Sequence, residues 1–203
     1  GGLIIETTID PNIQELAERS MEKRLNQVEK KRGFPHQKRS QWNGQGNPNY
    51  LQGATVVIDN ETGGVLAIVG GRNANESQFN RALQSERQIG SLFKPFMFLA
   101  AFDRGVKPYD TISDAPIRPS ELRGANPSWN PANSDGKYYL EIPVRKSLVE
   151  SRNTSAIRVA AKAGMENIVA VARSSGFNIS KIPLVPSSFL GSWGASAEAV
   201  ASA

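Results

Sequence analysis

A serine and a lysine stand three residues apart at Ser91 and Lys94, and this pair carries the clearest chemical signal in the 203-residue sequence. A serine hydroxyl becomes a good nucleophile when a nearby base takes its proton. A lysine amine can be that base when burial or neighbouring charge lowers its pKa. The run that follows Ser91 is strongly apolar and includes Phe93, Phe96 and Met97. If a helix begins at Ser91, both side chains lie on one face, so the pair predicts a serine activated by a buried lysine.

The Ser-x-x-Lys spacing is weak evidence by itself, because the chain contains it three times. Residues 20–23 fall within a basic helical pattern, and residues 134–137 read Ser-Asp-Gly-Lys, which is a turn sequence. Only Ser91 follows a glycine and opens an apolar stretch that stops at Gly105. Glycine is the usual residue after the end of a helix. The pair at Ser91 is therefore the one that we expect to do chemistry.

The composition excludes several other kinds of site. The chain has no cysteine, which excludes disulfides, thiolate metal sites and a cysteine nucleophile. Its single histidine, His36, lies in a basic stretch rich in Gly, Gln and Asn, and we interpret it as a solvated loop residue. A Ser–His–acid triad would depend on that one residue, and a histidine-rich metal site is impossible. We expect neither a metal nor an organic cofactor.

The net charge of +5 comes from one segment. Residues 22–39 hold seven Lys/Arg and two Glu, and the rest of the chain holds seventeen of each sign. We interpret this run as a solvated surface, with an anionic membrane or polymer surface as the functional alternative. Nucleic acid is disfavoured, because no aromatic residue interleaves with the charges before Phe34 and no recognition motif follows.

The pattern of apolar and turn residues predicts an α+β domain. Asp10-Pro11 starts a helix over residues 11–28, whose apolar stripe consists of Ile13, Leu16, Ala17, Met21, Leu25 and Val28. A polar loop covers residues 33–52, and two β-branched runs at 54–58 and 65–69 predict a hairpin. A buried helix follows over residues 91–104, then an irregular stretch over 106–142 and helical patterns from 143, at 156–163 and at 166–175.

Several short motifs occur in an order that resembles the transpeptidase domain of class A (bifunctional) penicillin-binding proteins, within the superfamily of serine β-lactamases and D,D-peptidases. The resemblance runs from about Thr7 to the end of the chain and is poorest over residues 33–52. The motifs are Val56-Val57-Ile58-Asp59, Phe79-Asn80-Arg81-Ala82, Gly90-Ser91-Leu92-Phe93-Lys94-Pro95, Asp114-Ala115-Pro116-Ile117, Asn133-Ser134-Asp135-Gly136-Lys137, Ser151-Arg152-Asn153 and Leu190-Gly191-Ser192.

The resemblance implies roles for four residues. Ser91 matches the family's nucleophile and Lys94 the lysine that activates it, although the identity of the acylation base is disputed in this enzyme group. Ser151 would pass a proton between Lys94 and an amine, and Asn153 would hold the substrate amide. A hydroxyl can both donate and accept, and a neutral amide pairs with a peptide bond without adding charge. Residues 128–130 also fit Ser-x-Asn, but they lie in the irregular stretch and we interpret them as coincidence.

The family's third motif, Lys-Thr/Ser-Gly, is absent, and Lys-Ala-Gly at residues 162–164 looks like a helix end. The resemblance implies the penicillin-binding-protein/β-lactamase-like fold, with helices packed on an antiparallel sheet that here lacks its C-terminal strands. We expect residues 1–52 to be a linker helix and loop, and residues 53–203 to be the N-terminal part of the transpeptidase domain. The third-motif strand would belong to another chain or to a nicked or lost segment, which would leave this chain inactive alone.

The resemblance implies a D,D-transpeptidase that cross-links peptidoglycan through a serine acyl-enzyme. Its partners would be a D-Ala–D-Ala stem peptide and an acceptor amine, with β-lactams as covalent inhibitors. A glycosyltransferase domain and a membrane anchor would lie upstream, and the active face would lie outside the bacterial cytoplasmic membrane. Two alternatives remain: a catalytically degenerate penicillin-binding scaffold or β-lactam sensor, and a serine β-lactamase. The second is disfavoured, because the Glu-x-x-Leu-Asn string at residues 22–26 precedes Ser91 rather than following it.

Overall fold

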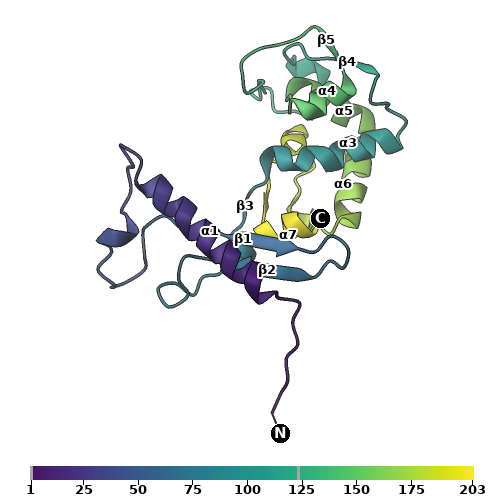
Figure 1. Ribbon diagram of the computed structural model, residues 1–203. Helices are drawn as coiled ribbons and strands as arrows, with labels where there is room; N and C mark the ends of the chain where they lie inside the picture. Colours follow the sequence, from purple (N-terminus) through teal and green to yellow (C-terminus); the bar gives the residue numbers. More distant parts are fainter. Residues whose placement is uncertain (1, 123) are drawn as a thin grey trace. The chain divides into compact units, whose positions relative to one another are not determined.

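The computed structural model describes residues 2–122 and 124–203, which form two compact units (Figure 1). Unit 1 comprises the chain up to Glu86 together with Ser196–Ser202, and unit 2 comprises Arg87–Ala195. The described residues form helices and three two-stranded antiparallel sheets, which confirms the α+β class. They form three separate pairs of strands rather than the one antiparallel sheet that the family resemblance implies.

Unit 1 consists of one long helix, one hairpin and short helices. Its elements are α1 (Pro11–Glu29), the 3-10 turn η1 (Arg39–Gln41), β1 (Thr55–Ile58), β2 (Val65–Val69), α2 (Arg81–Gln84) and α7 (Ala197–Ser202). The predicted start of α1 is confirmed, because the Asp10 carboxylate accepts hydrogen bonds from the Asn12 and Ile13 N–H groups. Pro11 takes the first helical position, where its missing N–H costs nothing.

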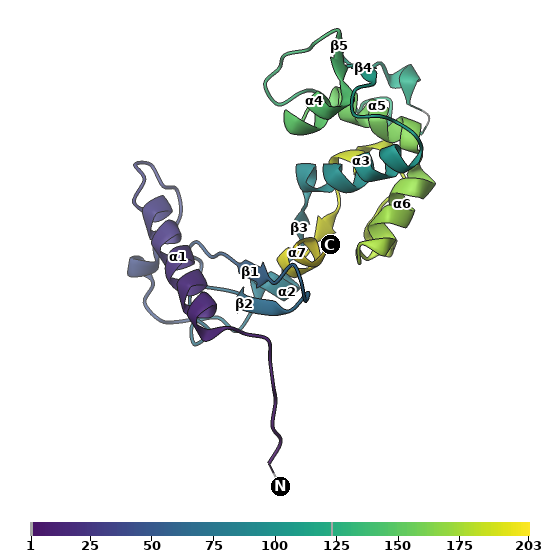
Figure 2. The ribbon, with the colours of Figure 1, turned by 45° about the vertical axis from the view of Figure 1, so that its right-hand side comes forward.

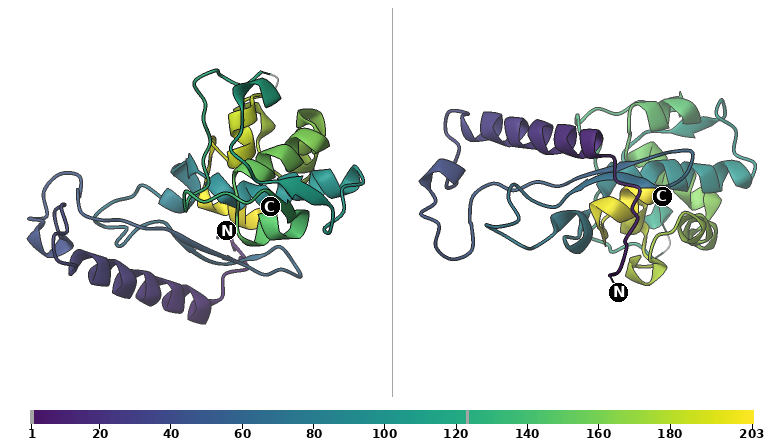
Figure 3. Two further views of the ribbon diagram at one scale, coloured as in Figure 1. Left: turned by 90° about the horizontal axis from the view of Figure 1, so that it is seen from above. Right: turned by 60° about the horizontal axis from the view of Figure 1, so that its bottom comes forward.

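The predicted hairpin is confirmed as the antiparallel pair β1–β2, and α1 lies along it (Figure 3). Ala17 of α1 is buried with Ala67 and Val69 of β2, and Ile13 and Met21 pack around them. The expected apolar stripe was wrong at Leu16, which is exposed. Leu16 lies on the face of α1 away from the hairpin, although leucine is a residue type common in protein cores.

A buried arginine joins α1 to the segment after β2. The side chain of Arg72 is 0% exposed and donates to Glu22 at 2.8 Å, to Glu29 at 2.6 Å and to Asn26 at 2.6 Å. Hydrogen bonds from Arg72 lower the pKa of Glu22 from the usual 4.5 to about 2. The stabilisation from Glu22 is therefore present above pH 4.5 and is lost as the pH falls toward 2. These two acids face inward, so the interpretation of residues 22–39 as a solvated surface applies to the lysines and not to Glu22 or Glu29.

Unit 2 is mostly helical (Figure 2). Its elements are β3 (Arg87–Gln88), η2 (Gly90–Phe93), α3 (Lys94–Asp103), β4 (Thr111–Ser113), η3 (Pro119–Glu121), β5 (Glu141–Pro143), α4 (Val144–Val149), α5 (Thr154–Ala163), α6 (Met165–Ser174), η4 (Ile179–Lys181), η5 (Pro186–Leu190) and β6 (Gly194–Ala195). β3 pairs with β6, and β4 pairs with β5. The second pair lies in the stretch 106–142 that was expected to be irregular, since three-residue strands are too short to give a periodic pattern.

Helix α3 packs against α5 and α6 and forms the core of unit 2. Met97 and Phe98 of α3 and Ile157 of α5 are fully buried. At the start of α3, the ring of Phe93 packs edge-on against Phe177 and Trp193, with centroids 6.2 and 5.1 Å away. The helix expected from Ser91 is confirmed with one difference: its first turn is the 3-10 turn η2, and the α-helix proper begins at Lys94. No helix of the described residues is both long and apolar enough to span a membrane.

The buried arginine gives a stability prediction for unit 1. Arg72→Met should lower the opening free energy of α1 and β2 by about 3 kcal/mol, because Glu29 is left buried without its cation. Hydrogen exchange of peptides from α1 and β2, read by mass spectrometry, measures this. Arg19→Met is the matched control, since Arg19 pairs with Glu15 on the exposed face of α1 and should change little. Equal protection in Arg72→Met and the parent chain would show that the ion pairs do not hold α1 in place.

Candidate active site

Ser91 lies in η2, one turn ahead of Lys94, and is exposed. The Lys94 N–H donates to the Ser91 carbonyl, which fixes the two residues at the predicted one-turn spacing. Gly90 precedes Ser91 with φ at +55°, a backbone angle that favours glycine. Its N–H donates to the Gly191 carbonyl at 3.0 Å, and the Ile89 N–H donates to Trp193 at 3.2 Å. The backbone before Ser91 is therefore tied to the segment that carries Leu-Gly-Ser.

Lys94 is a buried cation whose three hydrogen bonds all go to neutral oxygens. Its residue is 1% exposed, and Nζ lies 2.7 Å from the Ser151 carbonyl, 3.1 Å from Ser151 Oγ and 2.8 Å from Asn153 Oδ1. An ammonium group has three N–H donors, so this set uses all of them. The described contacts include no hydrogen bond between Lys94 and the Ser91 hydroxyl. A protonated Lys94 has no fourth donor for that hydroxyl and no lone pair to accept its proton.

Burial lowers the pKa of Lys94 from the usual 10.5 to about 8, and the positive charge of Arg152 adds to this effect. Burial disfavours the charged form of an amine, and a like charge does the same. At pH 7, roughly one Lys94 in ten is then the neutral amine, compared with fewer than one in a thousand for an exposed lysine. The environment therefore supplies a population of neutral amine near neutral pH.

Ser151 has φ at +51°, the only positive value among the described non-glycine residues. Serine seldom adopts this left-handed conformation, and such strain persists where the surrounding structure imposes it. The Ser151 N–H donates to Leu148 at 3.0 Å and the Arg152 N–H to Ser147 at 2.9 Å, which closes the turn at the end of α4. In this conformation both oxygens of Ser151 contact Lys94.

Asn153 joins the site to the start of α5. Its Oδ1 accepts from Lys94, and its Nδ2 donates to the Ala132 carbonyl at 2.7 Å. Asn133 Oδ1 accepts from the Asn153 N–H at 2.7 Å and from the Thr154 N–H at 3.2 Å. The first N–H groups of an α-helix have no partner within the helix, so Asn133 caps α5 from another part of the chain. This cap holds the backbone that positions Asn153.

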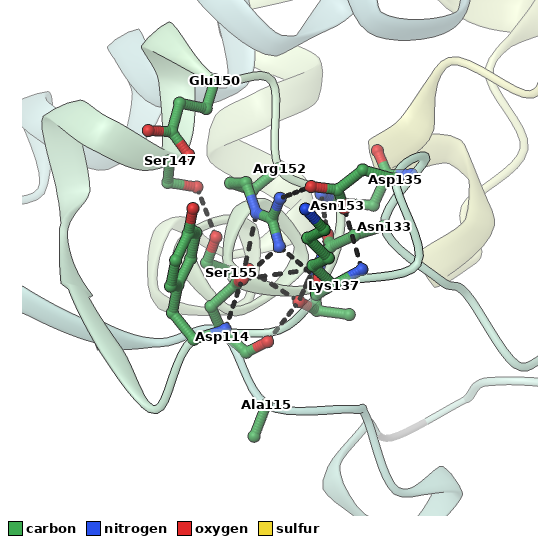
Figure 4. A network of polar contacts seen from close by, with 12 residues as sticks. Asp114, Ala115, Asn133, Asp135, Lys137, Ser147, Glu150, Arg152, Asn153 and Ser155 are labelled. Carbon is green, nitrogen blue, oxygen red and sulfur yellow. Dashed lines mark hydrogen bonds and ion pairs between the residues drawn. The ribbon is translucent and has the colours of Figure 1, made fainter.

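A buried polar network lies behind these residues (Figure 4). Asp114 is fully buried and accepts from Arg152 Nε at 3.0 Å, from Arg152 Nη2 at 2.7 Å and from the Thr154 hydroxyl at 2.8 Å. The Tyr139 N–H also donates to it, at 3.2 Å. Burial alone would raise the pKa of Asp114, but the hydrogen bonds from Arg152, Thr154 and Tyr139 outweigh burial and lower it. Asp114 is therefore a carboxylate, paired with Arg152.

The structure brings three of the four predicted site residues into contact, namely Lys94, Ser151 and Asn153, and it places Ser91 one turn from Lys94. Residues 20–23 lie within α1, and residues 134–137 lie in a turn, as the sequence indicated. Sequence reasoning gave no role to Asp114, Asn133 or Thr154. Two of them lie in motifs that were noticed only as points of resemblance, and a buried Asp or Asn has no local pattern that would reveal its partners. Within residues 2–122 and 124–203, no three His, Cys, Asp or Glu side chains gather as metal ligands would.

Comparisons with known proteins identify the family of this chain. The sequence model of the penicillin binding protein transpeptidase domain matches residues 53–191. Penicillin-binding protein 1A of Rickettsia conorii is 44% identical over 128 residues, which are 63% of this chain and 16% of that protein. Penicillin-binding protein 1A of Neisseria meningitidis serogroup A is 41% identical over 144 residues, 70% of this chain and 18% of that protein. The matches thus span less than a fifth of these relatives.

Solved structures give the same result. Penicillin-binding protein 1A from Haemophilus influenzae matches 73% of this chain and 22% of its own, with 30% identity and a TM-score of 0.67. The PonA1 protein from Mycobacterium tuberculosis, in complex with penicillin V, matches 95% of this chain and 48% of its own, with 25% identity and a TM-score of 0.67. The chain belongs to the penicillin-binding protein transpeptidase family, among the class A members that resemble penicillin-binding protein 1A.

Proposed function

We propose that this chain carries the acylating centre of a D,D-transpeptidase of peptidoglycan synthesis, with Ser91 as the nucleophile. The observation that carries the proposal is Lys94, which is buried among neutral oxygens of Ser151 and Asn153 and has its pKa lowered to about 8. A lysine in that state, one turn from an exposed serine, is suited to deprotonate it.

The first half-reaction follows from the hydrogen-bonding capacity of each partner. Neutral Lys94 keeps two N–H donors, which satisfy the Ser151 carbonyl and Asn153 Oδ1, since neither oxygen can donate. Its lone pair is then free for a hydroxyl. As Ser91 Oγ bonds to the D-Ala carbonyl carbon, its proton passes to Lys94. When the peptide C–N bond breaks, the Ser151 hydroxyl gives its proton to the departing D-Ala nitrogen and takes one from Lys94.

The second half-reaction runs the same path in reverse. The amine of a neighbouring stem peptide attacks the acyl carbonyl, and its proton passes through Ser151 to Lys94. The Ser91 oxygen leaves and recovers a proton from Lys94, which restores the starting state. Water in place of the amine would give hydrolysis, so the same residues serve a carboxypeptidase or a transpeptidase. In this proposal Asn153 Nδ2, now bonded to the Ala132 carbonyl, would hold a substrate amide once that bond exchanges.

The site needs further donors for the negative oxygen that forms during acyl transfer. The Ser91 N–H can be one of them, and the family's third motif supplies another. Residues 162–164 do not serve, because α5 ends at Ala163 and Gly164 is its cap. We propose that a strand bearing Lys-Thr/Ser-Gly supplies this second donor.

The wider setting rests on the relatives. We propose that residues 1–52 link this domain to an upstream glycosyltransferase domain, and that residues 53–203 are the N-terminal part of the transpeptidase domain. The active face would lie outside the cytoplasmic membrane, where donor and acceptor stem peptides occur. β-Lactams would acylate Ser91 as substrate mimics, and the complex of PonA1 with penicillin V supports this.

Gly191 has a positioning role in this proposal. Its φ is +66°, and a Cβ atom there would lie 2.2 Å from the Gly90 carbonyl oxygen and 2.6 Å from the Gly90 nitrogen. The obstacle is backbone, which cannot turn aside as a side chain can. Any side chain at Gly191 must therefore displace the residue before Ser91.

The nucleophile is tested by intact mass after exposure of the full-length gene product to penicillin. Attack opens the lactam ring and expels no atoms, so the expected gain is one whole penicillin. Ser91→Ala should abolish the gain. Ser20→Ala, which alters another Ser-x-x-Lys sequence, should retain it. A folded full-length protein that gains no mass would exclude the role of Ser91 and favour the degenerate scaffold or sensor.

The contact at Gly191 predicts a kinetic defect. Gly191→Ala should slow acylation of Ser91 by roughly tenfold to a hundredfold, because displacements of about 1 Å at a reacting group have effects of that size. Gly176→Ala is the matched control: Gly176 also has a positive φ, +87°, but nothing lies within 4 Å of its added Cβ. Rates of penicillin acylation measure both variants. Similar rates in the two would show that the Gly90–Gly191 contact does not position the nucleophile.

A further inference from the structure

Arg152 lies in the chain between the two residues that bind Lys94, yet its own side chain belongs to a different hydrogen-bond network. Ser151 and Asn153 both accept hydrogen bonds from Lys94 Nζ, whereas the Arg152 guanidinium lies in the network of Figure 4. Arg152 is buried, and Nη1 donates to Asp135 at 2.9 Å in addition to the two bonds with Asp114. Its Nη2 also donates to the Lys137 carbonyl.

These bonds fix the backbone on both sides of Arg152. A guanidinium is a rigid planar fork, so its bonds to Asp114, Asp135 and the Lys137 carbonyl leave it little freedom to turn. The strained φ of Ser151 and the start of α5 at Thr154 flank this anchored residue. Thr154 donates to the same Asp114 carboxylate that Arg152 binds. The anchored arginine therefore opposes relaxation of Ser151 to an ordinary conformation.

The network also determines which charges act on Lys94. All three of its hydrogen-bond partners are neutral, and among the described residues Arg152 is the one charged residue that perturbs its pKa. A carboxylate beside Lys94 would stabilise the ammonium form. Asp114 and Asp135 are both paired with Arg152, and Glu150, the chain neighbour of Ser151, is paired with Lys146.

We propose that Arg152 is a positioning residue of the acylating centre: it holds the Ser151 and Asn153 oxygens around Lys94 and keeps Asp114 and Asp135 engaged, so that Lys94 can release its proton. This inference rests on the proposed function, because it concerns the base that activates Ser91. Arg152 makes two contributions to the centre: the hydrogen-bonding geometry of its planar guanidinium and its positive charge. A separate variant tests each contribution.

The test is the pH profile of penicillin acylation in the full-length gene product. The rate should rise with pH as Lys94 loses its proton, with a midpoint near its pKa of about 8. Arg152→Lys keeps a positive charge but loses the planar guanidinium. The acylation rate at the high-pH plateau should therefore fall, whereas the midpoint of the pH profile should stay at the same pH. The double variant Asp114→Asn with Arg152→Gln replaces the ion pair by two neutral amides. It removes a positive charge from the surroundings of Lys94 without leaving Asp114 buried as an unpaired anion.

In the double variant the midpoint should move upward by about half a pH unit or more, which slows acylation at pH 7 by about threefold or more. Arg158→Gln is the control, because Arg158 lies on the nearby helix α5 and bonds the carbonyls of Ser113 and Ala115, whereas its ion pair is with Glu121 and not with Asp114. Its midpoint should equal that of the parent protein. Circular dichroism and thermal melting identify the variants that fold.

Three results would overturn the inference. A folded double variant with an unchanged midpoint, together with a folded Arg152→Lys whose plateau rate is unchanged, would mean that Arg152 serves the fold alone. An equal upward shift in Arg158→Gln would mean that the effect is not specific to Arg152. If the parent protein is not acylated at Ser91 at any pH, the proposed function itself fails, and this inference fails with it.

Discussion

The burial of one amine is the constraint on which the rest of this site depends. Lys94 lies at the start of the core helix α3, where it has almost no contact with water. An ammonium ion in such a place needs a hydrogen-bond acceptor for each of its hydrogens, and it has three. None of them carries a charge. The three hydrogen bonds offset part of the cost of burying the ammonium group. Because no acceptor is charged, they do not raise the pKa of Lys94 back to that of an exposed lysine.

Much of unit 2 can be understood as support for that arrangement. Two of the three acceptors belong to Ser151, whose backbone is strained so that both of its oxygens contact the amine. The strain is held by Arg152 and Asp114 on one side and by the Asn133 cap of α5 on the other. Such a buried ion pair contributes little to net stability, because desolvation offsets attraction. In this site the ion pair instead fixes the backbone geometry of Ser151.

The sequence predicted those parts of the fold and of the candidate site whose signals are local. The Ser91–Lys94 pair, the helix start at Asp10 and the β1–β2 hairpin all follow from spacing, capping and turn residues within about ten positions of one another. The approach of Ser151 to Lys94 joins residues 57 positions apart, and only the resemblance to a family suggested it. The partners of Asp114 lie 19 to 40 positions away, and no periodic pattern links them. Leu16 shows the converse error, since an apolar residue at helical spacing still lies on the exposed side of α1.

The ionisation of Lys94 can be measured directly in this chain by NMR. Lysine labelled with ¹³C at Cε, with the Lys94→Arg variant to assign its signal, gives a titration curve for that residue alone. A base at this position should titrate with a midpoint near 8, well below the 10.5 of an exposed lysine, because burial and Arg152 both disfavour the ammonium form. A midpoint at or above 10.5 would mean that Lys94 is a fixed cation at neutral pH, and it would contradict the assignment of Lys94 as the base.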